Sequence, residues 1–216
     1  MQYKDINPNP AALLSSLRDI GYNVETAIED LIDNSITAKS SRIEVQMIWN
    51  SGKPWMGILD DGKGMSNDDL VKAMTLAGNN PLHQRDKDDL GRFGLGLKTA
   101  SFSQCKELTV ITFNEGNLSA AIIDLVEVER NSDKGFRVGI LDKSDLESIS
   151  ILEEFPEFLS TKKGTLVLWQ NMDRVDSFDK SQSREKKFNS MKSSIKSRVQ
   201  LTFHRFLKYE SGYPAI

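Results

Sequence analysis

The stretch Leu90-Gly91-Arg92-Phe93-Gly94-Leu95-Gly96-Leu97-Lys98-Thr99-Ala100-Ser101 has the strongest influence on how the chain is interpreted. Three glycines fall within six residues, a lysine follows, and the apolar residues beyond it indicate a helix. Glycine permits positive φ and a close approach of the backbone to a ligand. A helix N-terminus presents unpaired N–H groups to an anion. The stretch therefore indicates a phosphate cradle, although a tight turn before a core helix explains these residues alone equally well.

The two commonest nucleotide-binding motifs do not fit this chain. The Walker pattern GxxxxGK[ST] fails because Leu97 stands between Gly96 and Lys98. A Rossmann GxGxxG that starts at Gly62 fails because its third glycine position holds Asn67. These mismatches argue against a P-loop fold and against a dinucleotide-binding fold.

A helix expected at residues 22–39 carries a polar group on one face. Asp30, Asp33 and Asn34 lie at positions i, i+3 and i+4, so they share a single helical turn. Their oxygens suit a hard cation such as Mg²⁺, and a nearby carboxylate can orient or deprotonate a water molecule. A solvated polar face is the alternative, and it is the better interpretation when this helix is considered alone.

A second polar group follows the apolar strand expected at residues 55–59. Asp60-x-Gly62-x-Gly64 places a carboxylate at the end of that strand, and Met65 comes next. Such a carboxylate can accept the exocyclic amine of adenine, while the glycines let the chain turn beneath the base. An ordinary Asp-Gly turn after a strand is the alternative.

Hydrophobic periodicity predicts an α+β chain instead of strict βαβ alternation. The expected strands are residues 42–49, 55–59, 107–113, 118–125, 136–140 and 164–170. The expected helices lie near residues 13–17, 22–39, 66–77, 96–104, within 142–158 and across 179–208. The polar segment 78–89 is long for a connection, which is typical of a lid or of a disordered loop.

Composition excludes several classes of protein. The 216 residues carry a net charge of −3 and are 38% hydrophobic, so a core can form and no overall nucleic-acid signature exists. The single cysteine, Cys105, rules out an intrachain disulfide and is expected to be a buried thiol. His83 and His204 match no zinc spacing. We see neither a signal peptide nor an apolar run long enough for a membrane span, and we expect a cytoplasmic protein without membrane contact.

The order of these motifs resembles the ATP-binding domain of the GHKL superfamily, named for gyrase, heat-shock chaperone, histidine kinase and MutL. Within it, Microrchidia-type ATPases and their bacterial relatives are the most similar. Residues 29–35 resemble the first box of that superfamily, residues 60–65 the second and residues 91–98 the third. Residues 163–167 resemble its late Gly-Thr strand, so the resemblance covers about residues 20–171.

The resemblance implies a two-layer α/β sandwich of the Bergerat type, with a mixed, mostly antiparallel sheet and helices on one face. It implies ATP and Mg²⁺ as cofactors, Asn34 as the metal ligand, Asp60 as the acceptor of the adenine amine and Thr165 as its support. It also implies a lid near residues 78–93 and dimerisation driven by nucleotide. The residues expected to contact the nucleotide are Asn34, Ala38, Asp60, Gly62, Gly64, Met65, Gly91, Arg92, Phe93, Gly94, Leu95, Gly96, Lys98 and Thr165.

Two positions depart from the superfamily pattern. Its catalytic glutamate lies four residues before the asparagine, where this chain has Asp30, one methylene shorter. Asp30 is still the expected base, because the neighbouring Glu29 points about 100° away around a helix. Thr37 stands where many relatives carry an aspartate.

Three functions remain open at this point: a slowly hydrolysing ATPase switch, a nucleotide sensor that does not hydrolyse, and a histidine kinase catalytic domain. The last is disfavoured because neither histidine lies in a phosphoacceptor-like helix pair. We expect an ATP-binding domain at residues 1–175 and a basic helical extension at residues 176–216. That extension could contact DNA, although a solvated or structural helix is the better interpretation, and a further region is expected to follow it.

Overall fold

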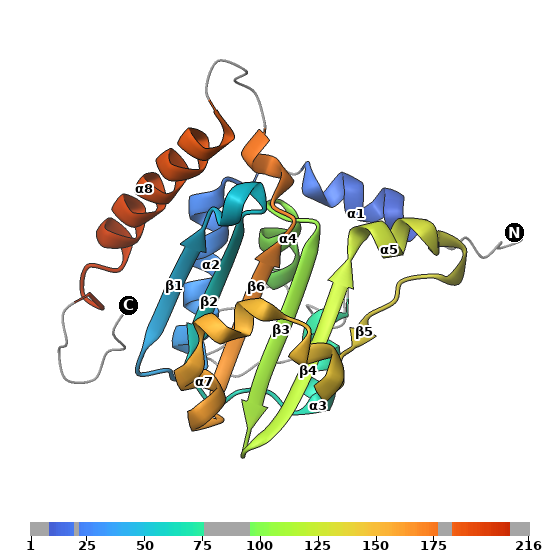
Figure 1. Ribbon diagram of the computed structural model, residues 1–216, viewed down its shortest axis with the longest axis horizontal. Coiled ribbons are helices and arrows are strands. Elements are labelled where there is room, and N and C mark those ends of the chain that lie inside the picture. The colour runs from blue at the N-terminus through green and yellow to red at the C-terminus, as the bar shows by residue number, and fades with distance from the viewer. Residues whose placement is uncertain (1–8, 20–21, 76–95, 177–182, 208–216) are drawn as a thin grey trace, which may run out of the picture.

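The computed structural model describes residues 9–19, 22–75, 96–176 and 183–207. Six strands form one sheet in the order β1-β2-β6-β3-β4-β5, and every pairing among them is antiparallel (Figure 1). The strands are β1 (Ile43–Ile48), β2 (Trp55–Asp60), β3 (Glu107–Asn114), β4 (Asn117–Asp124), β5 (Gly139–Ile140) and β6 (Gly164–Gln170). The α+β class and the antiparallel character of the sheet are confirmed.

One face of the sheet is covered by helices that come mostly from the first half of the chain (Figure 1). These helices are α1 (Pro10–Arg18), α2 (Val24–Thr37), α3 (Asn67–Met74) and α4 (Gly96–Phe102). Caps fix where they begin: the side chains of Asn9, Asn23 and Ser66 accept hydrogen bonds from the first turns of α1, α2 and α3. The predicted helix at residues 22–39 therefore forms within those limits.

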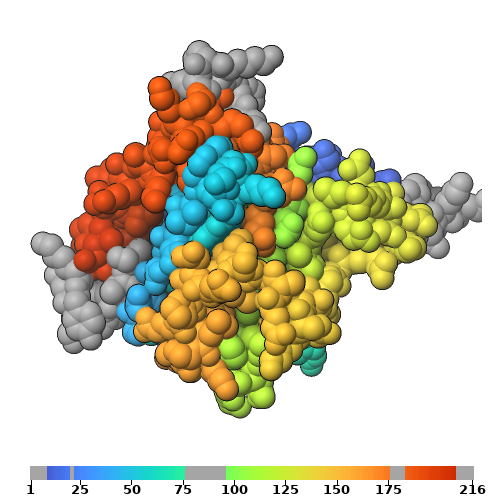
Figure 2. Space-filling model, viewed as in Figure 1, coloured from blue at the N-terminus to red at the C-terminus, as the bar shows by residue number. Residues whose placement is uncertain are grey.

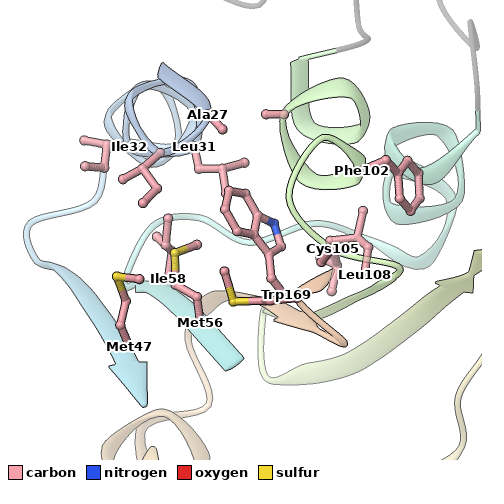
Figure 3. Packing of buried hydrophobic residues seen from close by; sticks show 14 of the residues in the cluster. Ala27, Leu31, Ile32, Met47, Met56, Ile58, Phe102, Cys105, Leu108 and Trp169 are labelled. Atoms are coloured by element: carbon pink, nitrogen blue, oxygen red, sulfur yellow. The ribbon is translucent and has the colours of Figure 1, made fainter. Parts of the chain in front are cut away.

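The main core lies between this helical layer and the sheet. Trp169 of β6 stands between α2 and α4, and Ala27 and Leu31 of α2 face it (Figure 3). The indole Nε1 of Trp169 donates to Ser101 Oγ at 2.7 Å, so the one polar atom of this buried ring has a partner. Cys105 is fully buried in the same core, as expected, and burial raises the pKa of its thiol.

A smaller hydrophobic cluster covers part of the second face of the sheet, which adds a layer to the predicted arrangement. It comes from α6 (Lys143–Glu147), η3 (Ser150–Glu154) and α7 (Pro156–Thr161), which lie in front of the strands in Figure 1. Gly57 makes room for it, because a Cβ there would lie 2.7 Å from Cζ of Phe155. The expected helix plus loop in residues 142–158 is thus a helix, a 3₁₀ turn and the start of a second helix.

Some predicted elements differ in extent from those observed. The strand expected at residues 136–140 is only Gly139–Ile140, and the end of the strand expected at 118–125 turns into α5 (Leu125–Arg130). Asp124 causes this change of direction, because its side chain caps α5 by accepting from the Val126 N–H. Short 3₁₀ turns also form at Asn50–Gly52, Ser132–Lys134 and Asp173–Asp176.

The basic helix α8 (Arg184–Thr202) packs back on α2, and its Lys192 donates to the Met47 carbonyl oxygen of the edge strand β1. Helix α8 lies at the left of the molecule in Figures 1 and 2, where it is drawn in orange-red. Three side chains of α8 and one from the residue just after it are buried in the main core: Phe188, Ile195, Val199 and Phe203. Among the described residues, no helix is both long and apolar enough to cross a membrane.

Candidate functional site

A cavity of about 330 Å³ lies between α2, the start of α4 and the ends of β2 and β6. Seven of the residues expected to contact nucleotide line it: Asn34, Ala38, Asp60, Gly64, Met65, Gly96 and Thr165. The other lining residues are Leu31, Ser35, Thr37, Lys63, Lys72, Ala73, Leu97, Val110 and Val167. The fold therefore collects side chains from all four sequence motifs around one space.

Asp60 is a buried carboxylate in the wall of this cavity, with 6% of its surface exposed. Its Oδ1 accepts from the Gly62 N–H at 2.8 Å and its Oδ2 accepts from Ser35 Oγ at 3.1 Å. Burial raises the pKa of Asp60 to about 6, although these hydrogen bonds act in the opposite direction. A buried carboxylate with free lone pairs can accept a hydrogen bond from a ligand.

The turn after Asp60 requires its glycines. Gly64 has φ +66°, and a Cβ there would lie 1.9 Å from the carbonyl oxygen of Phe113. Gly62 does not line the cavity, but a Cβ on it would lie 2.8 Å from Cβ of Ala38, so it lets the turn approach the end of α2. Met65 follows in the cavity wall, and its N–H donates to Thr112 Oγ1 at 2.9 Å.

Thr165 reaches the cavity because β6 lies beside β2. The antiparallel register places Thr165 opposite Asp60, although more than a hundred residues separate them in the sequence. The hydroxyls of Thr165 and Thr112 are hydrogen-bonded at 3.1 Å, and both residues are buried. The structure thus places the Gly-Thr strand next to the carboxylate that the resemblance assigns to the adenine site.

Helix α2 presents its acidic group beside the start of α4. Tyr22 Oη donates to Asp30 Oδ2 at 2.6 Å, and a Cβ on Gly96 would lie 3.8 Å from that same oxygen. Burial raises the pKa of Asp33, and the negative charges of Asp30 and Glu29 act in the same direction. Asn34 is exposed at the cavity, whereas Asp30 does not line it.

The glycine-rich stretch is only partly described by the structure. Gly91, Arg92, Phe93, Gly94 and Leu95 lie outside the described residues, as do most of the residues expected to form the lid. Gly96 begins α4 and lines the cavity.

Lys98 lies in the described part of this stretch, but it does not line the cavity. Its Nζ donates to the carbonyl oxygens of Ala73 and Thr75, at 2.6 and 2.8 Å, and so caps the end of α3. Burial lowers the pKa of Lys98 to about 8.

Several cavity residues were not among the predicted contacts. Ser35 follows Asn34 directly and holds Asp60, which its position in the first box could have indicated. Lys63 and Lys72 bring positive charge to the cavity wall, and only Lys63 lies inside a motif. Thr37, which departs from the superfamily pattern, has a buried Oγ1 without a hydrogen-bond partner in the described part of the chain. A buried hydroxyl without a partner favours the binding of a ligand that can form a hydrogen bond with it.

Glu29 points away from the cavity and is engaged by α8. Arg198 Nε donates to its Oε1 at 2.7 Å, and Thr202 Oγ1 donates to the same oxygen. Burial alone would raise the pKa of Glu29, but these two hydrogen bonds and the charge of Arg198 outweigh it, so that the pKa is lowered. This placement agrees with the choice of Asp30 over Glu29 as the candidate base.

The donor set fits a nucleotide and a hard cation. The cavity combines a buried acceptor at Asp60, a Thr37 hydroxyl that no described residue pairs, apolar walls and the cationic side chains of Lys63 and Lys72. Asn34 offers the kind of oxygen that Mg²⁺ accepts together with phosphate oxygens and water. In the described part of the chain no three His, Cys, Asp or Glu side chains cluster as a metal site.

Comparison with known proteins matches residues 22–165 to the family described as histidine kinase-, DNA gyrase B- and HSP90-like ATPase. The chain is 26% identical over 98 residues to ATPase morc-1 of Caenorhabditis elegans, which covers 45% of this chain and 11% of that protein. It is 29% identical over 126 residues to DNA mismatch repair protein MutL of Thermosipho melanesiensis, covering 54% of this chain and 22% of that protein. MutL of Fervidobacterium nodosum is 27% identical over 133 residues, with coverage of 57% and 22%. The chain therefore corresponds to less than a quarter of the length of these relatives.

Proposed function

This chain belongs to the family of histidine kinase-, DNA gyrase B- and HSP90-like ATPases, and we propose that it is an ATP-binding switch module that hydrolyses ATP slowly. One observation carries the proposal: a single cavity brings together Asp60, Asn34 and Gly96, which come from three separate motifs. Solvated polar faces and ordinary turns, the alternatives for each motif alone, do not explain why all three meet.

In this proposal, Asp60 recognises the base. Its carboxylate accepts the exocyclic amine of adenine, while Met65 packs against the ring and Thr165 supports the carboxylate from the next strand. A hydrogen bond to an ionised acceptor contributes roughly 1.5–3 kcal/mol, so this contact gives a preference for adenine over guanine, which carries no amine at that position.

The other side of the cavity holds the triphosphate. Asn34 provides an oxygen for Mg²⁺, and bound Mg²⁺ would neutralise charge on the phosphate oxygens. Gly96 lets the backbone come close, and Lys63 and Lys72 add positive charge. The predicted contacts at residues 91–95 belong to this part of the proposal.

Asp30 is proposed as the general base. It orients the attacking water and takes its proton on a carboxylate oxygen. An aspartate is one methylene shorter than the glutamate of the superfamily, so we expect slow turnover. The same shortening motivates a second candidate function, a nucleotide sensor that binds ATP without hydrolysing it.

Switching is proposed from the resemblance. Nucleotide would order the lid expected near residues 78–93 and favour dimerisation of the domain, a recognised mode of ligand-driven switching. Contact of DNA with α8 remains a weaker prediction. Lys192 donates to the Met47 carbonyl oxygen and Arg198 binds Glu29, so part of the positive charge of the helix is used within the fold.

Phosphate release and ATP calorimetry, measured on wild type, Asp30→Ala and Glu29→Gln, test the proposal. Glu29 is the matched control, because it is the adjacent carboxylate and is engaged by α8 instead of the cavity. We expect release above background in wild type and in Glu29→Gln, and background release in Asp30→Ala. Binding with background release in all three would support the sensor instead, and absence of ATP binding would refute both functions.

A further inference from the structure

Tyr22 and Asp30 are eight residues apart, yet their side chains are directly hydrogen-bonded. Tyr22 precedes the N-cap of α2, and Asp30 lies two turns into that helix. Tyr22 Oη donates to Asp30 Oδ2 at 2.6 Å, within the range of a hydrogen bond between a hydroxyl and an ionised carboxylate. Neither residue lines the cavity, but Asp30 Oδ2 lies beside Gly96, at the start of α4.

The backbone of Tyr22 is fixed from two directions. The Gln104 side chain, which is buried, donates from Nε2 to the Tyr22 carbonyl oxygen at 3.1 Å. On the other side, Asn23 caps α2 by accepting from the Thr26 N–H at 2.8 Å. Tyr22 also packs against the main hydrophobic core. The backbone of Tyr22 is therefore held between the turn that follows α4 and the N-terminus of α2.

An aspartate in the position of a glutamate has less reach, so its orientation matters more. A hydrogen bond to one carboxylate oxygen restricts rotation of the side chain and leaves the second oxygen, Oδ1, as the acceptor for a water molecule. We propose that Tyr22 is a positioning residue that holds the Asp30 carboxylate in its working orientation, an inference that rests on the proposed role of Asp30 as the base. Tyr22 acts through Asp30 and does not touch the nucleotide.

The kinetic test compares four proteins: wild type, Tyr22→Phe, Asp30→Asn and the variant that carries both substitutions. Phenylalanine keeps the ring and removes only the hydroxyl. We expect kcat to fall about tenfold with KM unchanged, since an interaction that serves only the chemical step affects kcat alone. In the Asp30→Asn background, Tyr22→Phe should have no further effect.

Ser101→Ala is the matched structural control. It removes a different buried hydrogen bond from the same core, the one from the Trp169 indole, without contact to Asp30. It should lower the melting temperature and leave kcat unchanged. This comparison separates a general loss of stability from a loss of positioning.

A second measurement does not depend on turnover. The hydrogen bond with Asp30, together with burial and the negative charge of Asp30, raises the pKa of Tyr22 to about 12. In ¹³Cζ-tyrosine NMR, with the Tyr22 resonance assigned from Tyr22→Phe, the phenol should stay protonated at about pH 11 in wild type. Asp30→Asn removes the charge and the hydrogen bond to a carboxylate but leaves the burial, so in that variant the phenol should titrate at a lower pH than in wild type.

The outcomes distinguish this inference from the proposed function. Wild-type turnover with an unaffected Tyr22→Phe variant, or a Tyr22 titration that Asp30→Asn does not change, overturns the positioning role alone. Wild-type turnover no higher than that of Asp30→Asn overturns the assignment of Asp30 as the base, and the positioning role with it. A tenfold loss confined to kcat, together with the shifted titration, supports both.

Discussion

Replacing Asp60 by asparagine should stabilise the free protein at neutral pH and weaken its binding of ATP. The carboxylate is buried, and its pKa is raised from 3.8 to about 6, which corresponds to ~3 kcal/mol of unfavourable free energy for the ionised form in the fold. Asparagine is nearly isosteric and carries no charge. The substitution therefore removes a cost of folding that the free protein bears at pH 7.

The neighbouring hydrogen bonds allow this exchange. Asparagine Oδ1 can still accept from the Gly62 N–H, and its Nδ2 can donate to Ser35 Oγ. Ser35 Oγ also lies 3.3 Å from the Leu31 carbonyl oxygen, to which its own proton can then be donated. The hydrogen bonds of Gly62 and Ser35 thus keep their partners, so we expect a net gain of ~1–3 kcal/mol in the free energy of unfolding near pH 7.5.

The raised pKa of Asp60 also fixes how the stability difference between Asp60→Asn and wild type changes with pH. Because the pKa of Asp60 is higher in the folded state, its unfavourable contribution is complete above about pH 6 and disappears as the pH falls toward 4. Urea unfolding at about pH 7.5 and about pH 4.5 should show the advantage of Asp60→Asn falling to ~1 kcal/mol or less at the lower pH. A variant less stable than wild type at neutral pH, or a difference independent of pH, would refute the reasoning.

Asp61→Asn is the matched control, since it changes the adjacent aspartate. Burial would raise the pKa of Asp61, but hydrogen bonds from Ser41 and from the Arg42 backbone outweigh it and lower the pKa. Its contribution is therefore favourable at neutral pH and lost on acidification, so Asp61→Asn should destabilise. In ATP calorimetry, only Asp60→Asn should lose affinity, by roughly 10–100-fold, together with the preference for ATP over GTP.

Three further substitutions test the site. Asn34→Ala should abolish the Mg²⁺-dependent part of ATP binding, and calorimetry that shows equal affinity with and without Asn34 would contradict its assignment as a metal ligand. Gly64→Ala should cost more than ~2 kcal/mol of stability, because its Cβ would overlap the Phe113 carbonyl oxygen. Gly116 has a similar positive φ but open space around it, so Gly116→Ala should cost only ~1 kcal/mol. Equal losses of stability in urea unfolding would argue against the tight turn at Gly64. Lys98→Met should lower the melting temperature, because the carbonyl oxygens at the end of α3 lose their donor; reduced ATP affinity without loss of stability would instead place Lys98 in the phosphate cradle.

The sequence predicted most of the fold where the hydrophobic pattern was regular. Apolar residues at helical spacing defined α2, and alternation in β1 and the apolar content of β2 and β6 defined strands whose limits differ little from those observed. It predicted β5 poorly, because a two-residue strand leaves too short a pattern, and it missed α5, which depends on the capping side chain of Asp124. The small cluster on the second face was also missed, since its short helices carry little periodicity.

For the site, the sequence determined which residue types are available and which of them share a helical turn or follow a strand. The resemblance led us to expect Asn34, Asp60, Gly64 and Gly96 around one space, whereas spacing alone related only residues of one helical turn, such as Asp30 and Asn34, or of one loop, such as Asp60 and Gly64. These local relations survive folding, since they follow from backbone geometry alone.

Only the tertiary structure decided which distant side chains meet. The β2–β6 register sets Thr165 beside Asp60, the end of α3 takes the ammonium group of Lys98, and α8 supplies the hydrogen-bond donors of Glu29. Such contacts depend on strand order and on the burial of whole helices, which no local spacing specifies. The partner of Asp30 also depends on tertiary contacts: Gln104, in the turn after α4, binds the backbone of Tyr22, whose hydroxyl donates to the carboxylate on which turnover is proposed to depend.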